Sequence, residues 1–205
     1  GFYHCLVNAA HQLRVTKNGE NYILAGYPWF KPRARDTFTA MPGLTLSIGE
    51  KERFELYMAT ATKAIYNFIR KEPMSVDIYE MEQPDTLMWA VWTLQQYAKY
   101  TSRNVCYEKY GQLLKDIMEF IWSGKHPNLQ IHDNGLVYAN GKDHAITWMN
   151  SSVNGRPIIP RSGYIVEFNA LWYNALKFFE QILTENEGAE NAELAKKATE
   201  YAEVA

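Results

Sequence analysis

The sequence predicts an all-α protein whose helices are joined alternately by short turns and long loops. Seven stretches repeat apolar side chains every three or four residues, the spacing that places them on one face of a helix. The segments 15–34, 71–83 and 124–163 break that period and carry turn residues together with aromatic ones. No repeat or linker divides the chain, so we expect a helical array with its long loops gathered at one end.

Apolar stripes indicate the helices, and turn residues indicate some of their ends. Residues 50–70 keep the helical spacing from Phe54 to Ile69. Pro42-Gly43 is expected to interrupt the second helix, and Ser123-Gly124 to end the fifth. The helices are expected at residues 2–14, 35–48, 50–70, 84–100, 104–122, 165–184 and 189–205.

The longest loop contains a signal for a small β-hairpin. The turn sequence His-Asp-Asn-Gly at residues 132–135 precedes the strand-like run 136–138. A loop this long in a compact helical protein is usually functional or disordered, and Trp148, Ile158 and Ile159 argue against disorder. We therefore expect an ordered loop with a role in function.

Composition and charge are those of an ordinary globular chain. The protein has 205 residues, of which 47% are hydrophobic and 21% charged, the size of one domain. With 21 Lys and Arg against 23 Asp and Glu and no basic block, neither nucleic acid nor an anionic membrane is expected as the main partner. No apolar run reaches the roughly 18 residues that span a bilayer, and the start of the chain shows no secretion signal.

Cysteine and histidine usage gives no reason to expect a disulfide, a metal or a cofactor. Cys5 and Cys106 lie in helix-like patterns without ligand spacing, so both are expected to be reduced and buried. No phosphate-binding loop, zinc-protease motif or hydrolase elbow occurs. The histidines at 126, 132 and 144 fit no regular metal site and are expected on a loop surface.

Aromatic residues make up 14% of the chain, with 14 Tyr and 6 Trp, and they suit sugar-binding clefts as well as cores. In one aromatic segment, residues 25–37, Arg35 and Asp36 fall at a helix start, where a guanidinium and a carboxylate can clasp the hydroxyls of a polar ligand. The alternative is structural, with Asp36 interacting with the helix dipole while Arg33 or Arg35 is merely solvated.

A second segment, residues 79–89, gathers carboxylates before a helix that carries Trp89 and Trp92. Pro84 is expected at a favourable first-turn position, with Asp85 beside it to complement the helix dipole. The segment forms either part of a ligand site or a capped helix with a solvated acidic lead-in and two core tryptophans.

A third segment, residues 146–172, contains Glu167 and Asn169 where an apolar helix begins. Glu167 either pairs with Arg161 as a structural group or faces a cleft with a raised pKa. Periodicity does not decide between these alternatives.

At these segments the sequence resembles the glucosidase region of glycogen debranching enzymes, the amylo-alpha-1,6-glucosidase family, which is related in fold to glucoamylases. The family patterns G-Y-P-W-F, R-D-T-F and A-x-P-G-L are met by residues 26–30, 35–38 and 40–44. The later T-W-M, P-R and V-E-x-N-A-L-W-Y-N-A-L patterns are met by residues 147–149, 160–161 and 166–176. These ordered motifs span most of the chain.

The resemblance implies an incomplete (α/α)6 toroid, a ring of six helical hairpins with the substrate cleft formed by loops at one end. About seven helices are predicted, fewer than six hairpins require, so residues 1–205 are expected to be the N-terminal part of a glycosidase catalytic domain. The chain also begins inside an apolar pattern and ends in an Ala-rich helix without a glycine stop, as a piece of a longer protein would. This piece alone is expected to be inactive, because the remainder of the domain is missing.

The resemblance also implies a reaction. Family members hydrolyse alpha-1,6-linked glucose at glycogen branch points with inversion, using a carboxylic acid to protonate the leaving oxygen and a carboxylate to activate water. The family's base lies nearer the end of the domain, beyond Ala205, and its usual acid is the Asp of T-W-M-D, where this sequence has Asn150. An amide cannot donate a catalytic proton as a carboxylic acid does, so Asn150 either only orients substrate while another carboxylate substitutes, or marks lost activity.

Glu167 is the favoured substitute for the acid, because it lies on the helix entry after the same loop. Arg35 and Asp36 would hydrogen-bond the terminal glucose, the three tryptophans would stack on sugar faces, and Arg161 would hold either the sugar or Glu167. The residues expected to bind substrate are Trp29, Arg35, Asp36, Asp85, Trp89, Trp148 and Arg161. The other carboxylates considered for the acid are Asp36, Glu80, Glu82 and Asp85.

The predicted function is therefore inverting hydrolysis of alpha-glucan by a cytoplasmic glycogen debranching enzyme that uses no cofactor. The rival function is that of a non-catalytic glucan-binding or scaffolding protein, which keeps the aromatic cleft but has lost the proton donor at Asn150. Cleft carboxylates separate the two functions, since an inverting glycosidase needs two of them about 6.5–9.5 Å apart.

Overall fold

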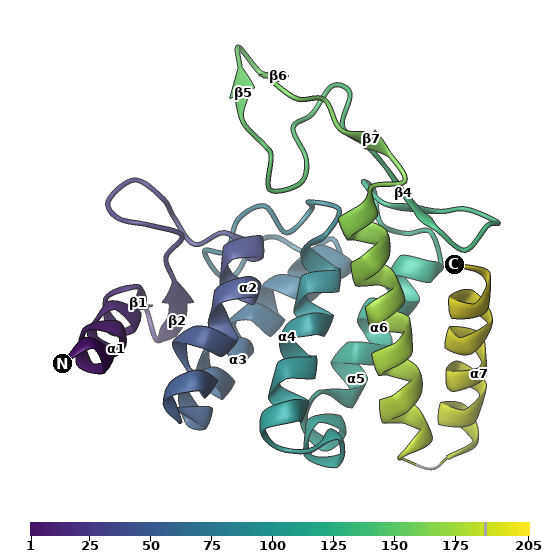
Figure 1. The fold of residues 1–205 in the computed structure, drawn as a ribbon, viewed down its shortest axis with the longest axis horizontal. Coiled ribbons are helices and arrows are strands. Elements are labelled where there is room, and N and C mark those ends of the chain that lie inside the picture. Colours follow the sequence, from purple (N-terminus) through teal and green to yellow (C-terminus); the bar gives the residue numbers. More distant parts are fainter. Residues whose placement is uncertain (187) are drawn as a thin grey trace. The chain divides into compact units, whose positions relative to one another are not determined.

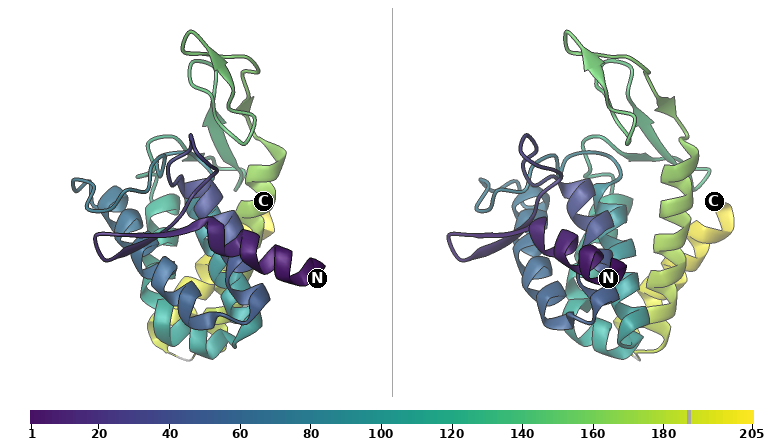
Figure 2. Two further views of the ribbon diagram at one scale, coloured as in Figure 1. Left: turned by 90° about the vertical axis from the view of Figure 1, so that its left-hand side faces the viewer. Right: turned by 60° about the vertical axis from the view of Figure 1, so that its left-hand side comes forward.

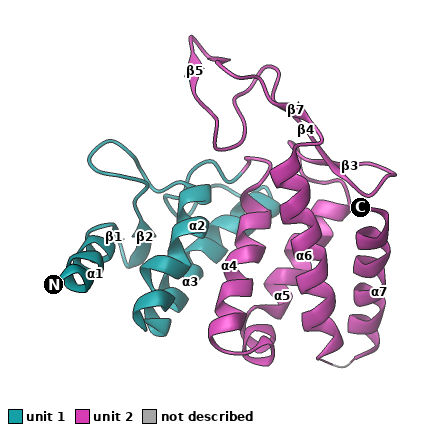
Figure 3. Cartoon of the chain, in the orientation of Figure 1, with its two compact units in different colours: residues 1–81 teal, residues 82–205 magenta. Residues whose placement is uncertain are grey.

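A computed structural model describes residues 1–186 and 188–205 of the protein (Figure 1). Most of these residues are helical, which confirms the all-α class, and a few short strands accompany the helices. The chain divides into two compact units, Gly1–Met81 and Glu82–Ala205, each with its own core (Figure 3).

The first unit combines a β-hairpin with helices. Its elements are α1 (Phe2–Gln12), β1 (Arg14–Lys17), β2 (Glu20–Ile23), α2 (Ala34–Leu44), the 3-10 helix η1 (Leu46–Ile48) and α3 (Lys51–Ile69). Helices α2 and α3 pack against each other as a hairpin, and β2 packs on both of them. The largest buried side chains of this unit are Ile23, Phe38, Met41, Phe54, Met58 and Ile65.

The β1–β2 hairpin occupies part of the segment predicted to be a loop, so the prediction is wrong there. Asn18 and Gly19 form its turn with φ angles of 53° and 78°. Both residues thus adopt the left-handed backbone of a type I′ turn, which Asn-Gly strongly favours between antiparallel strands. The Asn-Gly pair between Val15 and Tyr22 was the local signal for this hairpin.

Helix α2 continues through Pro42 to Leu44, so the predicted interruption of residues 35–48 lies at Thr45 and not at Pro42-Gly43. Because Pro42 lies near the C-terminal end of α2, its missing N–H removes a hydrogen bond without splitting the helix. The hydroxyl of Thr45 donates to the carbonyl oxygen of Met41 at 2.6 Å and satisfies one of the groups left open at this end.

The second unit consists of two helical hairpins and a long connection with short strands. Its helices are α4 (Thr86–Tyr100), α5 (Arg103–Trp122), α6 (Val166–Thr184) and α7 (Ala189–Val204). Its strands are β3 (Gln130–Ile131), β4 (Val137–Asn140), β5 (Ser152–Val153), β6 (Arg156–Pro157) and β7 (Ser162–Gly163). Strand β4 pairs antiparallel with β3 and β7, and β5 pairs with β6. The β3–β4 pair confirms the hairpin predicted around the turn 132–135.

Helices α4 and α6 pack side by side and run in the same direction (Figure 1). The Asn174 amide of α6 donates to the Gln95 side-chain oxygen of α4 at 3.0 Å. At 1.5 Å of rise per residue, each of these residues lies about 13 Å beyond the start of its helix. The first turns of α4 and α6 therefore lie level with each other at one end of the unit.

Two further predictions about these helices need correction. Helix α4 begins at Thr86, so Pro84 lies before the helix and Asp85 is its N-cap residue. Cys106 is buried in α5 as predicted, whereas Cys5 is exposed. The exposure of Cys5 follows from the position of α1, of which Ala10 is the one buried residue.

The long loop between β4 and β7 is closed at its base. Asn140 pairs with Ser162 across the two strands, and the Gly141 N–H donates to the Ser162 hydroxyl at 2.9 Å. A Cβ atom on Gly141 would collide with the Arg161 carbonyl oxygen, so this close approach requires glycine. Residues 142–160 therefore leave and re-enter the sheet at one point, and they project beyond the start of α6 (Figure 2).

Candidate functional site

The start of α2 presents Arg35 and Asp36 in its first turn, as the sequence predicted. The N-cap residue Arg33 is extended, which directs the chain into the helix at this point. Asp36 is half-exposed, and the helix dipole favours a carboxylate there. Within the described residues no hydrogen bond or ion pair engages the Asp36 carboxylate, so it is available to a ligand.

The loop before α2 exposes Trp29, whose side chain is 83% accessible to solvent. The Phe30 N–H donates to the Gly26 carbonyl oxygen at 3.1 Å and closes the turn that carries Trp29. The Arg33 guanidinium lies 4.8 Å from the centre of the Phe30 ring, and its Nε atom lies 3.8 Å from an oxygen of Glu80. Arg33 therefore fixes the base of this loop and is not merely solvated.

The start of α4 holds Trp89 through Asp85. The Trp89 indole N–H donates to the Asp85 carboxylate at 3.0 Å, and the Trp89 and Trp92 rings meet edge to face with centres 5.5 Å apart. Asp85 is only 3% exposed, so its predicted contact with substrate has no support in this geometry. Its carboxylate positions the half-buried Trp89 ring instead.

His126 follows α5 and is buried, so its predicted place on a loop surface is wrong. Its Nδ1 atom accepts a hydrogen bond from the Asn128 N–H at 3.1 Å, and its ring packs against Phe120. Burial lowers the pKa of His126 to about 4, an effect larger than the opposing attraction of the Asp85 charge. His126 is therefore neutral at pH 7.

The three loop histidines do not form a metal site. Within residues 1–186 and 188–205, no group of three or more His, Cys, Asp or Glu side chains is arranged to hold a metal ion. His144 is exposed and His132 is half-buried, while His126 lies in the interior.

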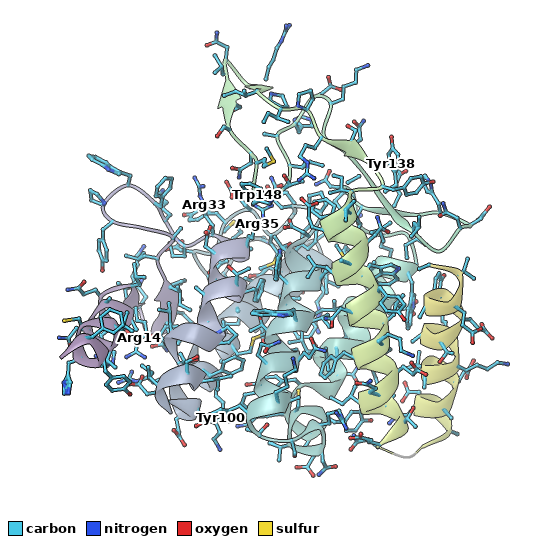
Figure 4. The ribbon with its side chains drawn as sticks, viewed as in Figure 1. Arg14, Arg33, Arg35, Tyr100, Tyr138 and Trp148 are labelled. Atoms are coloured by element: carbon cyan, nitrogen blue, oxygen red, sulfur yellow. The ribbon has the colours of Figure 1, made fainter. Side chains whose placement is uncertain are left out.

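The long loop exposes Trp148, labelled in Figure 4, with 70% of its side chain accessible. Thr147 is completely buried with a positive φ of 69°, and its hydroxyl oxygen accepts the Met149 N–H at 3.0 Å. This side-chain turn fixes the backbone on both sides of Trp148. Asn150 follows half-exposed, and its amide forms no hydrogen bond with other described residues, so both side chains are open to a ligand.

The start of α6 places Glu167 against Arg161. Two hydrogen bonds join the guanidinium to the carboxylate, one of them 3.0 Å long between Nη2 and Oε2. These hydrogen bonds, more than any other effect, lower the pKa of Glu167 below its ordinary value. Of the two alternatives left open by the sequence, the structure therefore has the ion pair, and the raised pKa is wrong.

Asn169, the other polar residue at this helix start, has a structural role. Its amide oxygen accepts the Val137 N–H at 2.8 Å, and its amide nitrogen donates to the Val137 carbonyl oxygen at 3.0 Å. Asn169 thereby ties the first turn of α6 to strand β4, and it holds the sheet in place beside Glu167.

A cavity of about 420 Å³ lies in the second unit, between the lead-in to α4 and the long loop. Its lining includes Gln83, Asn128, Asn140, His144 and Ser152. The Asn128 amide donates to the carbonyl oxygen of Glu82, another lining residue, at 2.8 Å. The side-chain oxygen of Gln83 is buried without a hydrogen-bond partner among the described residues, so it can accept a donor from a ligand or a water.

The chemistry of this cavity suits an uncharged polyhydroxylated ligand. Amide, hydroxyl and imidazole groups offer both donors and acceptors, as sugar hydroxyls require. The volume falls within the range of small-molecule sites, about 300–1,000 Å³. The cavity lies beside two predicted motifs, because Gln83 precedes Asp85 and Ser152 follows Asn150.

A model of the amylo-alpha-1,6-glucosidase family matches residues 7–205, nearly the whole chain. The chain belongs to this family. The match confirms the resemblance read from the motifs, and it makes the protein a relative of the glycosidases that debranch glycogen. Comparisons with curated proteins and with solved structures give no match. Among the described residues, no helix is long and apolar enough to cross a membrane.

In this amylo-alpha-1,6-glucosidase family member, the fold groups only some of the predicted residues. Asp85 contacts Trp89, and Arg161 contacts Glu167, while Trp148 and Asn150 lie on the loop that borders the cavity. Trp29, Arg35 and Asp36 belong to the first unit. Sequence reasoning missed Asn128 and Asn140, because they lie outside every motif and only the fold brings them to one cavity.

Proposed function

We propose that this chain forms part of an α-glucan hydrolase that removes α-1,6-linked glucose with inversion of configuration. One observation carries the proposal: this member of the family has an amide-rich cavity, bordered by a loop that exposes Trp148. A sugar ring needs both surfaces, since its hydroxyls seek hydrogen bonds and its C–H groups pack on aromatic faces.

The proposed domain organisation extends the hairpins of this chain to a ring. The first helix of each hairpin, α2/α3, α4/α5 and α6/α7, begins beside one of the carboxylates Asp36, Asp85 and Glu167. An (α/α)6 toroid repeats such a hairpin six times around a common cleft. We infer that residues 1–205 supply the N-terminal part of this ring, and that the remainder of the parent protein supplies the base. The cytoplasmic location stays a prediction from the family.

The proposed roles follow from what each side chain offers. Arg35 and Asp36 hydrogen-bond the hydroxyls of the terminal glucose, and Trp29 and Trp148 stack on sugar faces. Trp89, which Asp85 fixes, provides a third and more rigid ring. Asn150 orients the substrate through its open amide.

The general acid is the most demanding of these roles. Glu167 is the favoured candidate, but its ion pair with Arg161 favours the ionised form. Glu167 can donate a proton only after this pair opens, for example when substrate hydroxyls take over the guanidinium of Arg161. Arg161 therefore decides whether Glu167 serves as an acid or remains an acceptor.

The rival function, a non-catalytic α-glucan-binding protein, draws on two specific observations. Asn150 stands where the family acid is expected, and Glu167 has a lowered pKa where an acid would need a raised one. Binding requires neither proton donor, and the cavity and tryptophans remain suited to it.

Proton NMR separates the two functions. The parent protein is incubated with a maltooligosaccharide that bears one α-1,6-linked glucose, with the 205-residue chain as control. Early release of β-glucose by the parent would support the inverting hydrolase. Ligand line-broadening without glucose release would support the binding protein, and the absence of both effects would contradict both proposals.

Asp36→Ala tests the first unit in the same assay. Loss of charge-assisted hydrogen bonds to a positioned sugar, worth about 1.5–3 kcal/mol, is expected to weaken binding or kcat/KM about tenfold to a hundredfold. Glu52→Ala is the matched control, because Glu52 is an exposed carboxylate in the first turn of α3. Equal values for the Asp36→Ala parent protein and the unchanged parent would remove Asp36 from the site.

A further inference from the structure

The outer face of the three-stranded sheet carries three aromatic rings in mutual contact, which we call the aromatic track: His132, Tyr138 and Tyr164. The His132 and Tyr138 rings are stacked, with centres 5.0 Å apart and an angle of 15° between them. The Tyr164 ring meets both edge to face, and its hydroxyl lies 2.6 Å from His132 Nδ1. Rings locked in this way form a preorganised surface, and ligand binding need not order them.

These rings are not part of the hydrophobic core. On β4, Val137 and Ala139 are buried, whereas Tyr138 and Asn140 lie on the opposite face. Tyr164 is 45% exposed, and Tyr138 lies on the loop side of the second unit (Figure 4). The buried face of the same strand could have taken these rings, yet they are accessible to solvent. A cluster of exposed aromatic rings of this kind indicates a binding surface.

The aromatic track begins at the amide-rich cavity. Asn140 lines that cavity and, as the next outward residue of β4, lies about 7 Å from Tyr138 along the strand. Tyr138 in turn stacks on His132. A ligand chain that leaves the cavity past Asn140 therefore meets the aromatic track directly.

The aromatic track ends at a second cavity of about 790 Å³, which His132 and Asp133 line together with side chains of α7. The charged groups around it are Asp133, Glu193, Lys196, Lys197 and Glu200. Charges of both signs leave little net field, which suits an uncharged ligand better than a polyanion. The two cavities share no lining residue, so they are distinct sites.

We propose that Asn140, the aromatic track and the second cavity bind an α-glucan chain along several glucosyl units, beyond the short oligosaccharide held in the amide-rich cavity. This inference rests on the proposed function, because the first cavity must take a sugar. The occupant is an uncharged polymer with alternating hydroxyl-rich edges and C–H faces, which a strip of rings, amides and mixed charges can contact in turn.

Affinity electrophoresis of the parent protein in gels with glycogen, together with calorimetric titration of maltotriose, tests the proposal. Tyr138→Ala and Tyr164→Ala are each expected to weaken glycogen binding about fivefold to tenfold by loss of an aromatic contact. Maltotriose, which fits the amide-rich cavity alone, should bind these variants as it binds the unchanged chain. Tyr100→Ala is the matched control, since Tyr100 is 48% exposed at the far end of α4 (Figure 4).

The outcomes distinguish this proposal from the function on which it rests. Unchanged glycogen affinity in both variants, with maltotriose still bound, would overturn the track and leave the proposed function standing. Failure of the unchanged parent protein to bind either sugar would overturn both. Circular dichroism checks the fold, and if Tyr138→Ala does not fold, the more exposed Tyr164 decides the question.

Discussion

Trp89 and Trp148 belong to the same unit, and the protein holds them in opposite ways. Trp89 is half-buried at the start of α4, with its indole N–H bonded to a buried carboxylate and its ring against Trp92. Trp148 lies on the long loop with 70% of its side chain exposed, and only the turn around Thr147 fixes its backbone. The Trp89 ring is preorganised, whereas the Trp148 side chain must lose rotational freedom when it binds a ligand.

This difference indicates how the two rings share the work of binding. Ordering an exposed side chain costs about 0.5–1.5 kcal/mol, which a preorganised ring avoids. Trp89 therefore offers binding energy at little entropic cost, while Trp148 can adapt to different ligands. Substitutions near Trp89 should act on stability, and substitutions at Trp148 should act on binding.

The largest effect is expected from His126, which lies in the region of Asp85. Its pKa is lowered to about 4 in the folded chain and is near 6.5 when unfolded, so the unfolded state binds more protons between these values. Stability from this group is complete above pH 6.5 and is lost as the pH falls toward 4, by about 3 kcal/mol in all. Urea unfolding at pH 7 and pH 5 measures about 2 kcal/mol of this loss.

His126→Leu should flatten that pH dependence, whereas His144→Ala, at an exposed histidine, should leave it unchanged. A slope that survives in His126→Leu would assign the pH dependence to other groups.

The second largest loss of stability is expected when Trp89 loses its hydrogen bond to Asp85. Asp85→Ala leaves a half-buried indole N–H without its acceptor and is expected to cost about 2 kcal/mol of unfolding free energy. Asp85→Asn keeps an acceptor oxygen and should cost less. Chemical denaturation followed by tryptophan fluorescence measures both, and equal stability of Asp85→Ala and the unchanged chain would mean that Trp89 is not held by this bond.

The smallest effect on stability is expected from Trp148→Ala, within about 0.5 kcal/mol, because the side chain is mostly in water. Maltooligosaccharide affinity should nevertheless fall about tenfold, as loss of a stacking ring implies. A variant that is less stable but binds as before would reverse the comparison between the two tryptophans.

The positions of the helices could be predicted from the sequence, because their apolar stripes depend on the local spacing of residues. Residues 104–122 show this best, since α5 begins at Arg103 with a Ser102 cap and stops before Gly124, whose φ is 71°. Local rules mislead where position in the element decides their weight. Pro42 does not break α2 because it lies near the helix end, and Asn18-Gly19 specifies a hairpin turn inside a segment predicted to be a loop.

The site was less predictable, because its properties depend on partners distant in the sequence. The motifs identified Asp85 and Glu167 as candidates. Only the structure shows that Asp85 accepts a hydrogen bond from the Trp89 indole and that Glu167 pairs with Arg161. Burial could not be read from periodicity either, as His126 and Cys5 demonstrate in opposite directions. The sequence could locate candidate residues, and the fold decided which atoms each of them faces.

The closed base of the long loop has a consequence for how such proteins diversify. Residues 142–160 leave and re-enter at Gly141 and Arg161, so an insertion or deletion between them need not change the register of β4 and β7. The exposed part of the loop, with its Trp148 and Asn150, can therefore be exchanged as a cassette, provided that the buried Ile146 and Thr147 are kept. Evolution, or a protein engineer, can vary ligand preference there at little risk to folding.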